Sequence, residues 1–192
     1  MIQRRSWLLG LLPSVLAGHA LAQDASASKE LAAQTLQRLR PWLGNPRLVG
    51  EHRFTYWGFD VYHASLWASS APFAPADWAS QRLVLELRYL RDFQGRDIAQ
   101  RSITEMHSQR ALSAEQSAVW LQTLQSLLPN VRSGETLTGV YIPDAGAQFL
   151  HQGKAVGEVR ELEFARRFFG IWLAPQTSQP LLRQQLLAGA LP

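Results

Sequence analysis

The fold is indicated most clearly by one stretch, Leu83-Val84-Leu85-Glu86-Leu87-Arg88-Tyr89-Leu90. Its odd-numbered positions are apolar or aromatic, whereas its even-numbered positions include a glutamate and an arginine. Successive side chains of a strand point to opposite faces, so this alternation predicts a half-buried β-strand over residues 82–92. The rest of the fold can be built outward from this strand.

Upstream of it, two more strands are predicted on either side of Gly58. Residues 53–57 and 59–67 are rich in aromatic and β-branched side chains. Neither face of 59–67 is purely polar, which predicts a strand covered on both sides. Residues 71–80 contain two prolines and are predicted to form a loop. Nearer the N-terminus we expect a linker over 24–28 and a helix over 29–42 that ends at Pro41.

Downstream, helices alternate with strands. One helix is predicted from Asp97 to about Arg110, and a second is capped by Ser113 and ends before Pro129. Strands are predicted over 136–142, 147–151 and 155–159, followed by helices over 162–173 and from Pro180 onward. The order of strands, helices, strands and helices predicts an α+β fold, with one mostly antiparallel sheet and helices on one face.

Residues 1–22 have the features of a cleavable signal peptide. Arg4 and Arg5 precede an apolar run over 7–17, and Ala20-Leu21-Ala22 forms a cleavage site before Gln23. The apolar run is too short to span a bilayer, so we expect no stable membrane anchor after cleavage and a periplasmic protein. The paired arginines resemble a twin-arginine signal, but an ordinary secretory signal fits equally well.

The composition excludes several classes of function. The chain of 192 residues has no cysteine, which excludes thiol catalysis and iron–sulfur clusters. Beyond residue 22 there are 17 basic and 15 acidic residues, with no block of like charge, so nucleic acid is not expected as a partner. No nucleotide-binding motif is present, and the histidines lack metal-ligand spacing. We therefore expect no cofactor and no metal.

One charged stretch, residues 88–105, has two interpretations. Arg101 and Glu105 are four residues apart on the predicted helix. They form either an ordinary surface ion pair or a cation presented to a cleft, and spacing alone favours the surface pair.

Five segments, taken together, resemble the bacterial exported branch of the chalcone isomerase superfamily. They are Trp57–Trp67, Leu85–Asp92, Gly95–Ile103, Leu137–Pro143 and Phe164–Leu173. The resemblance implies an open-faced β-sandwich, in which a large antiparallel sheet carries a helical layer on one face and a ligand cleft lies between them. Together with the predicted signal peptide, it divides the chain into a signal peptide (1–22), a linker with an N-terminal helix (23–46) and a chalcone isomerase-like domain (47–192).

The resemblance also implies a set of site residues: Arg53, Tyr62, Ile98, Arg101, Glu105, Arg167 and Phe168. In the plant enzymes these positions carry mainly polar groups, which order a water and stabilise an enolate. Here Ile98 has no hydroxyl, and Glu105 adds negative charge where an anion would form. Arg53 with Tyr62 is instead predicted to clamp a carboxylate, with Arg101 assisting.

The superfamily contains isomerases that cyclise chalcones and members that bind fatty acids without known chemistry. Our leading hypothesis is a non-catalytic exported binding protein for a fatty acid or a similar amphipathic small molecule. The alternative is an isomerase or lyase with an altered substrate. A third possibility is a structural role in the cell envelope, with side chains filling the cleft.

Overall fold

The computed structural model describes residues 17–69 and 72–189, which divide into two compact units, 1–37 and 38–192. Helix α1 (Ala17–Leu43) begins in the first unit and ends in the second. Residues 1–16 of the predicted signal peptide lie outside the described residues. Within the described residues, no helix combines the length and the apolarity needed to cross a membrane.

Helix α1 corrects two predictions. The predicted linker, residues 24–28, is helical, and the helix ends two residues after Pro41 rather than at it. Two of the five linker residues are alanines, which favour helix continuation. Pro41 lies in the last turn of α1, where its missing N–H removes one hydrogen bond of the helix without preventing the turn from closing.

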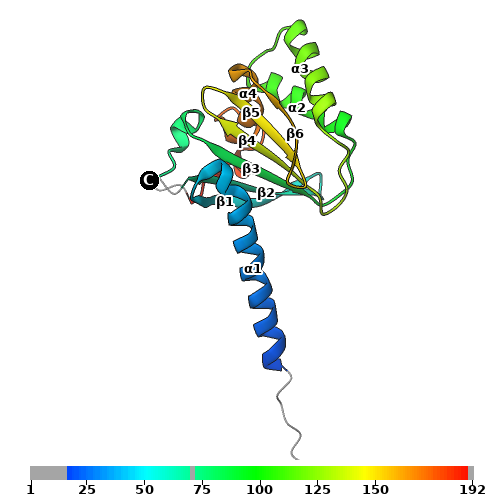
Figure 1. Cartoon of the computed structure of the whole chain (residues 1–192). Coiled ribbons are helices and arrows are strands. Elements are labelled where there is room, and N and C mark those ends of the chain that lie inside the picture. The colour runs from blue at the N-terminus through cyan, green and yellow to red at the C-terminus, as the bar shows by residue number, and fades with distance from the viewer. Residues whose placement is uncertain (1–16, 70–71, 190–192) are drawn as a thin grey trace, which may run out of the picture. The chain divides into compact units, whose positions relative to one another are not determined.

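Six strands form a single antiparallel sheet in which each strand pairs with its neighbours in sequence (Figure 1). The strands are β1 (Pro46–Tyr56), β2 (Phe59–Ser69), β3 (Leu83–Tyr89), β4 (Thr136–Ile142), β5 (Gly146–His151) and β6 (Lys154–Val159). All five pairings are antiparallel. The predicted α+β fold with a large antiparallel sheet is confirmed.

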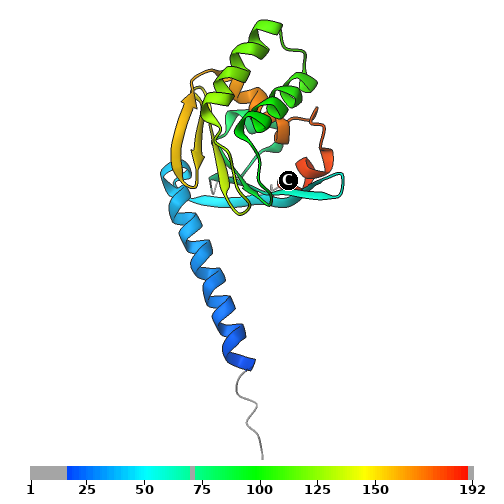
Figure 2. The same cartoon turned by 90° about the vertical axis from the view of Figure 1, so that its right-hand side faces the viewer.

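The helices that lie wholly within the second unit gather on one face of this sheet (Figure 2). They are α2 (Gly95–Gln109), α3 (Ala114–Leu127), α4 (Leu162–Leu173) and the short α5 (Pro180–Leu186). Helix α2 packs against α3 and α4, and α4 packs against β5. Ser113 forms the expected cap of α3, together with Gln116 in a capping box. The predicted loop over 71–80 contains a short 3-10 helix, η1 (Pro75–Ser80).

Strand β3 is more buried than its alternating pattern predicted. Its inner face, which carries Leu83, Leu85, Leu87 and Tyr89, belongs to the main core. On its outer face, Val84 packs with Leu39, Leu43, Val140 and Leu150 in a second, smaller core. Glu86, beside Val84, is buried and ion-paired with Arg38. The strand is therefore covered on both faces along most of its length.

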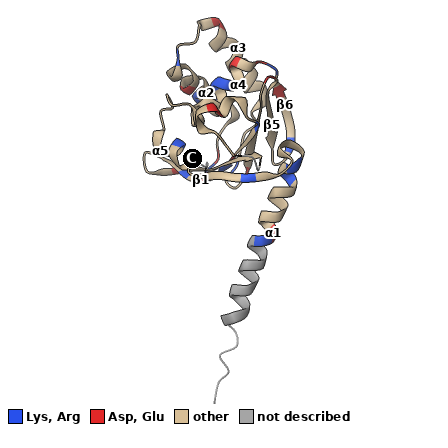
Figure 3. Cartoon of the chain, turned by 90° about the vertical axis from the view of Figure 1, so that its left-hand side faces the viewer, with Lys and Arg blue, Asp and Glu red and all other residues tan. Residues whose placement is uncertain are grey.

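Acidic and basic positions are intermixed on the visible face of the second unit, and neither sign gathers there (Figure 3).

A candidate ligand cavity between the sheet and the helices

A cavity of about 320 Å³ lies between the inner face of the sheet and helices α2 and α4. This volume falls near the lower end of the range typical of small-molecule sites. Strands β1 to β5 contribute side chains from their inner faces, because strand alternation directs every second residue toward the helices. Most of the lining is apolar, and much of it is aromatic.

Aromatic rings form a continuous wall on one side of the cavity. Phe54 stacks on Tyr62 with ring centroids 5.0 Å apart, and Tyr62 meets the edge of Tyr89 at 5.8 Å. Phe93 continues the row at 5.5 Å from Tyr89. On the opposite side, the ring of Phe168 lies 5.1 Å from that of Phe149 in an edge-to-face contact. Such pairs hold their geometry, so the wall is a preformed surface.

Two phenols supply polar groups inside this apolar space: Tyr89, which is buried, and Tyr62, which is partly buried. The Trp172 indole N–H donates a hydrogen bond of 3.0 Å to the Tyr62 hydroxyl. Burial raises the pKa of Tyr62 far above its usual range, although the bond from Trp172 opposes this. Burial also raises the pKa of Tyr89, whose hydroxyl makes no hydrogen bond to another described residue. Both phenols therefore stay neutral at physiological pH, and each retains a proton to donate.

A charged pair lies at the helical side of the cavity. Arg101 Nη2 is 2.6 Å from Glu105 Oε1, and the Ser178 hydroxyl donates to Glu105 Oε2, also at 2.6 Å. The Glu105 side chain is only 10% exposed, whereas that of Arg101 is 50% exposed. Glu105 is therefore held from two sides, and Arg101 keeps N–H donors free for another acceptor.

The surroundings of Arg101 favour its charge. Burial lowers its pKa, but Tyr56 and Glu105 outweigh this, and the pKa of Arg101 is raised overall. Its guanidinium also lies 5.0 Å from the centre of the Tyr56 ring. Both interpretations of the Arg101–Glu105 spacing therefore apply: the two residues form an ion pair, and Arg101 presents a cation to the cavity.

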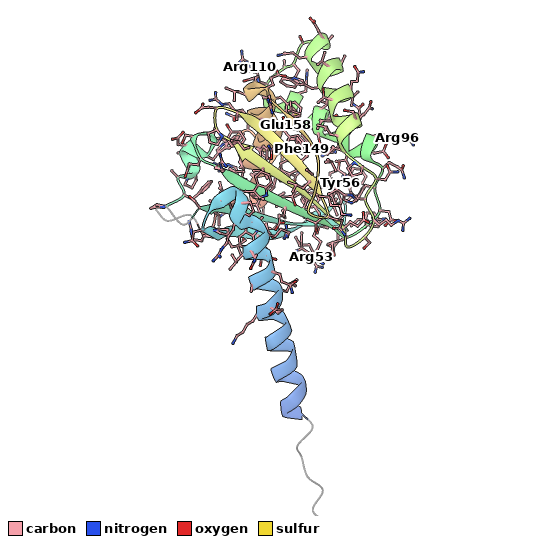
Figure 4. The ribbon with its side chains drawn as sticks, in the orientation of Figure 1. Arg53, Tyr56, Arg96, Arg110, Phe149 and Glu158 are labelled. Atoms are coloured by element: carbon pink, nitrogen blue, oxygen red, sulfur yellow. The ribbon has the colours of Figure 1, made fainter. Side chains whose placement is uncertain are left out.

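Arg53 does not reach the cavity, so the predicted clamp of Arg53 with Tyr62 is not formed. A β-bulge in the β1–β2 pair shifts the register, so that Phe54 lies opposite Tyr62 and Arg53 opposite His63. Arg53 therefore projects from the outer face, where its Nη1 binds Asp60 at 2.9 Å. In the view of Figure 4, Arg53 lies at the lower edge of the sheet, apart from Tyr56 and Phe149.

Arg167 also points away from the cavity. Its Nε donates to Glu163, one turn earlier in α4, at 2.7 Å. The other five predicted site residues all line the cavity: Tyr62, Ile98, Arg101, Glu105 and Phe168. On α4 it is Phe168, the neighbour of Arg167, that faces the ligand space.

Several residues that line the cavity or bind its lining were missed by sequence reasoning. Tyr89 shares the inner face of β3 with Leu85 and Leu87, so the alternating pattern could have identified it. Trp172 follows Phe168 by four residues on α4, a spacing that places both on one helix face. Ser178, which holds Glu105, lies between α4 and α5, where no local pattern indicates its position. Within the described residues, no cluster of three or more His, Cys, Asp or Glu side chains could hold a metal ion.

Comparison with known proteins gives three results. A family model described as chalcone isomerase-like matches residues 52–188. A protein of Haemophilus influenzae, described as uncharacterised, is 25% identical over 139 residues, which are 72% of this chain but just under two thirds, 66%, of that protein. Among solved structures, a fatty-acid binding protein of Arabidopsis thaliana superposes with a TM-score of 0.58 over 76% of this chain and 88% of that chain, at 14% identity. This last likeness concerns the fold.

Proposed function

Since this chain belongs to the chalcone isomerase-like family, we propose that it is a non-catalytic binding protein for a fatty acid or a similar amphipathic carboxylate. One observation carries the proposal: a preformed apolar cavity with a half-exposed arginine at its edge. The apolar tail of the ligand would occupy the space beside Phe149 and Phe168. The name of the Arabidopsis structural neighbour supports the same ligand class.

In this proposal Arg101, rather than Arg53, binds the acid group. Its exposed N–H donors suit a carboxylate, since guanidinium–carboxylate hydrogen bonds are charge-assisted and often bidentate. Tyr62 lines the same cavity as Arg101 and Glu105. A neutral phenol such as Tyr62 or Tyr89 can donate a further hydrogen bond to the ligand.

The lining favours binding over isomerisation. An enolate forming beside Arg101 would be destabilised by an adjacent anion. Ile98 offers no hydrogen bond there, and Glu105 carries negative charge beside the only arginine of the lining. Both tyrosines hold their protons well above neutral pH, so neither serves as a base under physiological conditions.

We propose further that the protein acts outside the cytoplasm, in the periplasm. The support is the N-terminal sequence alone, with Arg4 and Arg5, a short apolar run and the Ala20-Leu21-Ala22 site. Sequencing the N-terminus of protein recovered from the periplasm should begin at Gln23. Recovery of uncleaved chain from the cytoplasm would contradict this location.

The binding proposal is tested by extracting the protein purified from cells that express the full chain. Organic extraction followed by mass spectrometry should release a stoichiometric amphipathic acid. The delipidated protein should then bind a fluorescent fatty acid with saturation near one per chain. An empty extract together with no saturable binding would overturn the proposal. Loss of chalcone absorbance on incubation with the protein would support the isomerase alternative instead.

A further inference from the structure

The tip of the β1–β2 hairpin exposes three aromatic residues that flank Gly58, and we call Tyr56, Trp57 and Phe59 the aromatic tip. Trp57 is 85% exposed and Phe59 60% exposed. Together with the partly exposed Tyr56, they form a cluster of large aromatic side chains at one projecting turn. Exposure of this apolar surface to water is unfavourable and calls for a functional reason.

The backbone of the turn adds a second observation. Tyr56 pairs with Phe59, so Trp57 and Gly58 are the two central residues of the turn. Both have positive φ, 51° and 78°. Turns of this kind favour asparagine or aspartate followed by glycine, because bulky residues are strained at positive φ. A tryptophan here therefore opposes both hairpin stability and solubility, so neither explains its presence.

The aromatic tip is continuous with the cavity. The ring of Trp57 lies 6.1 Å from that of Tyr56, and Tyr56 lies 6.5 Å from Phe54. Phe54 then stacks on Tyr62 inside the cavity. Tyr56 also lines the cavity and lies beside Arg101. An unbroken row of rings thus leads from the exposed turn to the ligand space.

A cation accompanies the aromatic tip. The guanidinium of Arg91 lies 4.8 Å from the centre of the Phe59 ring. Within the described part of the chain, no carboxylate lies within ion-pairing distance of Arg91. Arg91 is thus available to an external anion, next to side chains that avoid water.

We propose that the aromatic tip inserts into the interfacial layer of a phospholipid membrane. Tryptophan and tyrosine concentrate at this layer because they combine an apolar ring with a polar group, and Arg91 suits a lipid phosphate. A projecting turn can enter the headgroup layer without burying the rest of the sheet. Membrane contact depends on the tip alone. If the proposed ligand function also holds, this contact brings the cavity to the membrane surface, from which an amphipathic acid can pass into the cavity.

The test uses vesicles of phosphatidylethanolamine and phosphatidylglycerol in a 3:1 ratio, with binding measured by flotation. The decisive variant is Trp57→Asn, because Asn-Gly is the preferred dipeptide for this turn. The variant should fold at least as stably as the parent chain. It should bind vesicles about tenfold more weakly, as expected when one large side chain that inserts into the lipid layer is removed. Phe59→Thr should weaken vesicle binding in the same direction.

Leu181→Asn is the matched control, because Leu181 is also 60% exposed but lies on α5, away from the turn. It should leave vesicle binding unchanged. A parent chain that fails to float with vesicles overturns the proposal and points to a protein partner for the tip. Equal loss in the Trp57 and Leu181 variants overturns it as well.

A second measurement separates this proposal from the proposed function. Solution binding of the fluorescent fatty acid should be the same for the parent chain and Trp57→Asn, because Trp57 does not line the cavity. Vesicle binding without fatty-acid binding would leave membrane contact standing and overturn the ligand function. Fatty-acid binding without vesicle binding would do the reverse.

Discussion

Trp172 and Tyr62 join the helical layer to the sheet through one hydrogen bond, 3.0 Å from the indole Nε1 to the phenol oxygen. The bond links α4 to β2 beside the cavity. It also determines the role of Tyr62: the oxygen accepts from Trp172, which leaves the phenol proton free for a ligand.

Removing this hydroxyl should destabilise the fold. Tyr62→Phe leaves a largely buried indole N–H without its acceptor, which costs about 1–3 kcal/mol of unfolding free energy. Urea unfolding of Tyr62→Phe, Trp172→Phe and the double variant forms a cycle that isolates the pair. We expect the double variant to lose less stability than the two single losses combined. Simple additivity would show that the hydrogen bond does not couple these residues.

Stability should fall steeply in alkaline solution. Burial raises the pKa of both Tyr62 and Tyr89, so above the ordinary tyrosine pKa of about 10 the unfolded chain releases protons that the folded chain retains. Each phenol then removes about 1.4 kcal/mol of stability per pH unit, a loss that starts near pH 10 and is absent below it. Urea unfolding at pH 9, 10 and 11 measures the slope.

The variant Tyr89→Phe assigns this pH dependence. It should reduce the loss between pH 10 and 11 by about 1 kcal/mol, since one of the two phenols whose pKa is raised in the fold no longer titrates. Tyr56→Phe is the control, because Tyr56 is 41% exposed, whereas Tyr89 is buried. An unchanged slope in Tyr89→Phe would mean that Tyr89 ionises as readily when folded as when unfolded.

Arg101, and not Arg53, should control the affinity for a carboxylate ligand. Arg101→Gln removes a charge-assisted contact worth about 1.5–3 kcal/mol, which corresponds to roughly ten- to hundredfold weaker binding. Arg53→Gln is the matched control and should change affinity less than about twofold, because Arg53 faces away from the cavity. Fluorescent fatty-acid titration measures both. A larger loss of affinity in Arg53→Gln would favour the hypothesis in which Arg53 and Tyr62 bind the carboxylate.

Substitution of Glu105 should have the opposite effect on carboxylate binding to substitution of Arg101. Glu105 competes with the ligand for Arg101, to which it is bonded at 2.6 Å. Glu105→Gln should therefore tighten carboxylate binding severalfold, and titration with the uncharged alcohol analogue should show no such gain. Weaker carboxylate binding in this variant would indicate that Glu105 positions Arg101 rather than competing for it.

The contrast between Arg53 and Arg101 shows where sequence reasoning succeeds and fails. In a regular hairpin with its turn at Trp57 and Gly58, Arg53 would lie opposite Tyr62 on the cavity face. The bulge adds a residue to β2 between Asp60 and Tyr62, and this moves Arg53 to the outer face. Nothing in the local sequence indicates the bulge, so the strands could be predicted but not their register.

The burial of β3 illustrates a second limit. Its alternation correctly predicted the strand and its inner face. The outer face is covered partly by Leu39 and Leu43, more than forty residues earlier in the chain, so no local window contains the reason for its burial. Helical positions were more reliable: Ile98, Arg101 and Glu105 follow the three- and four-residue spacing of α2, and all line the cavity.

Filling the cavity should abolish ligand binding without unfolding the protein. Ile98 lies on α2, lines the cavity and is partly exposed, so a larger side chain can enter the 320 Å³ space from its edge. Ile98→Trp should therefore keep the parent stability within about 1.5 kcal/mol, since the added atoms occupy empty volume rather than packed core. Fatty-acid binding should fall below detection. Val119→Trp, on the exposed face of α3, is the control and should bind normally. If Ile98→Trp still binds with parent affinity, the ligand does not occupy this cavity.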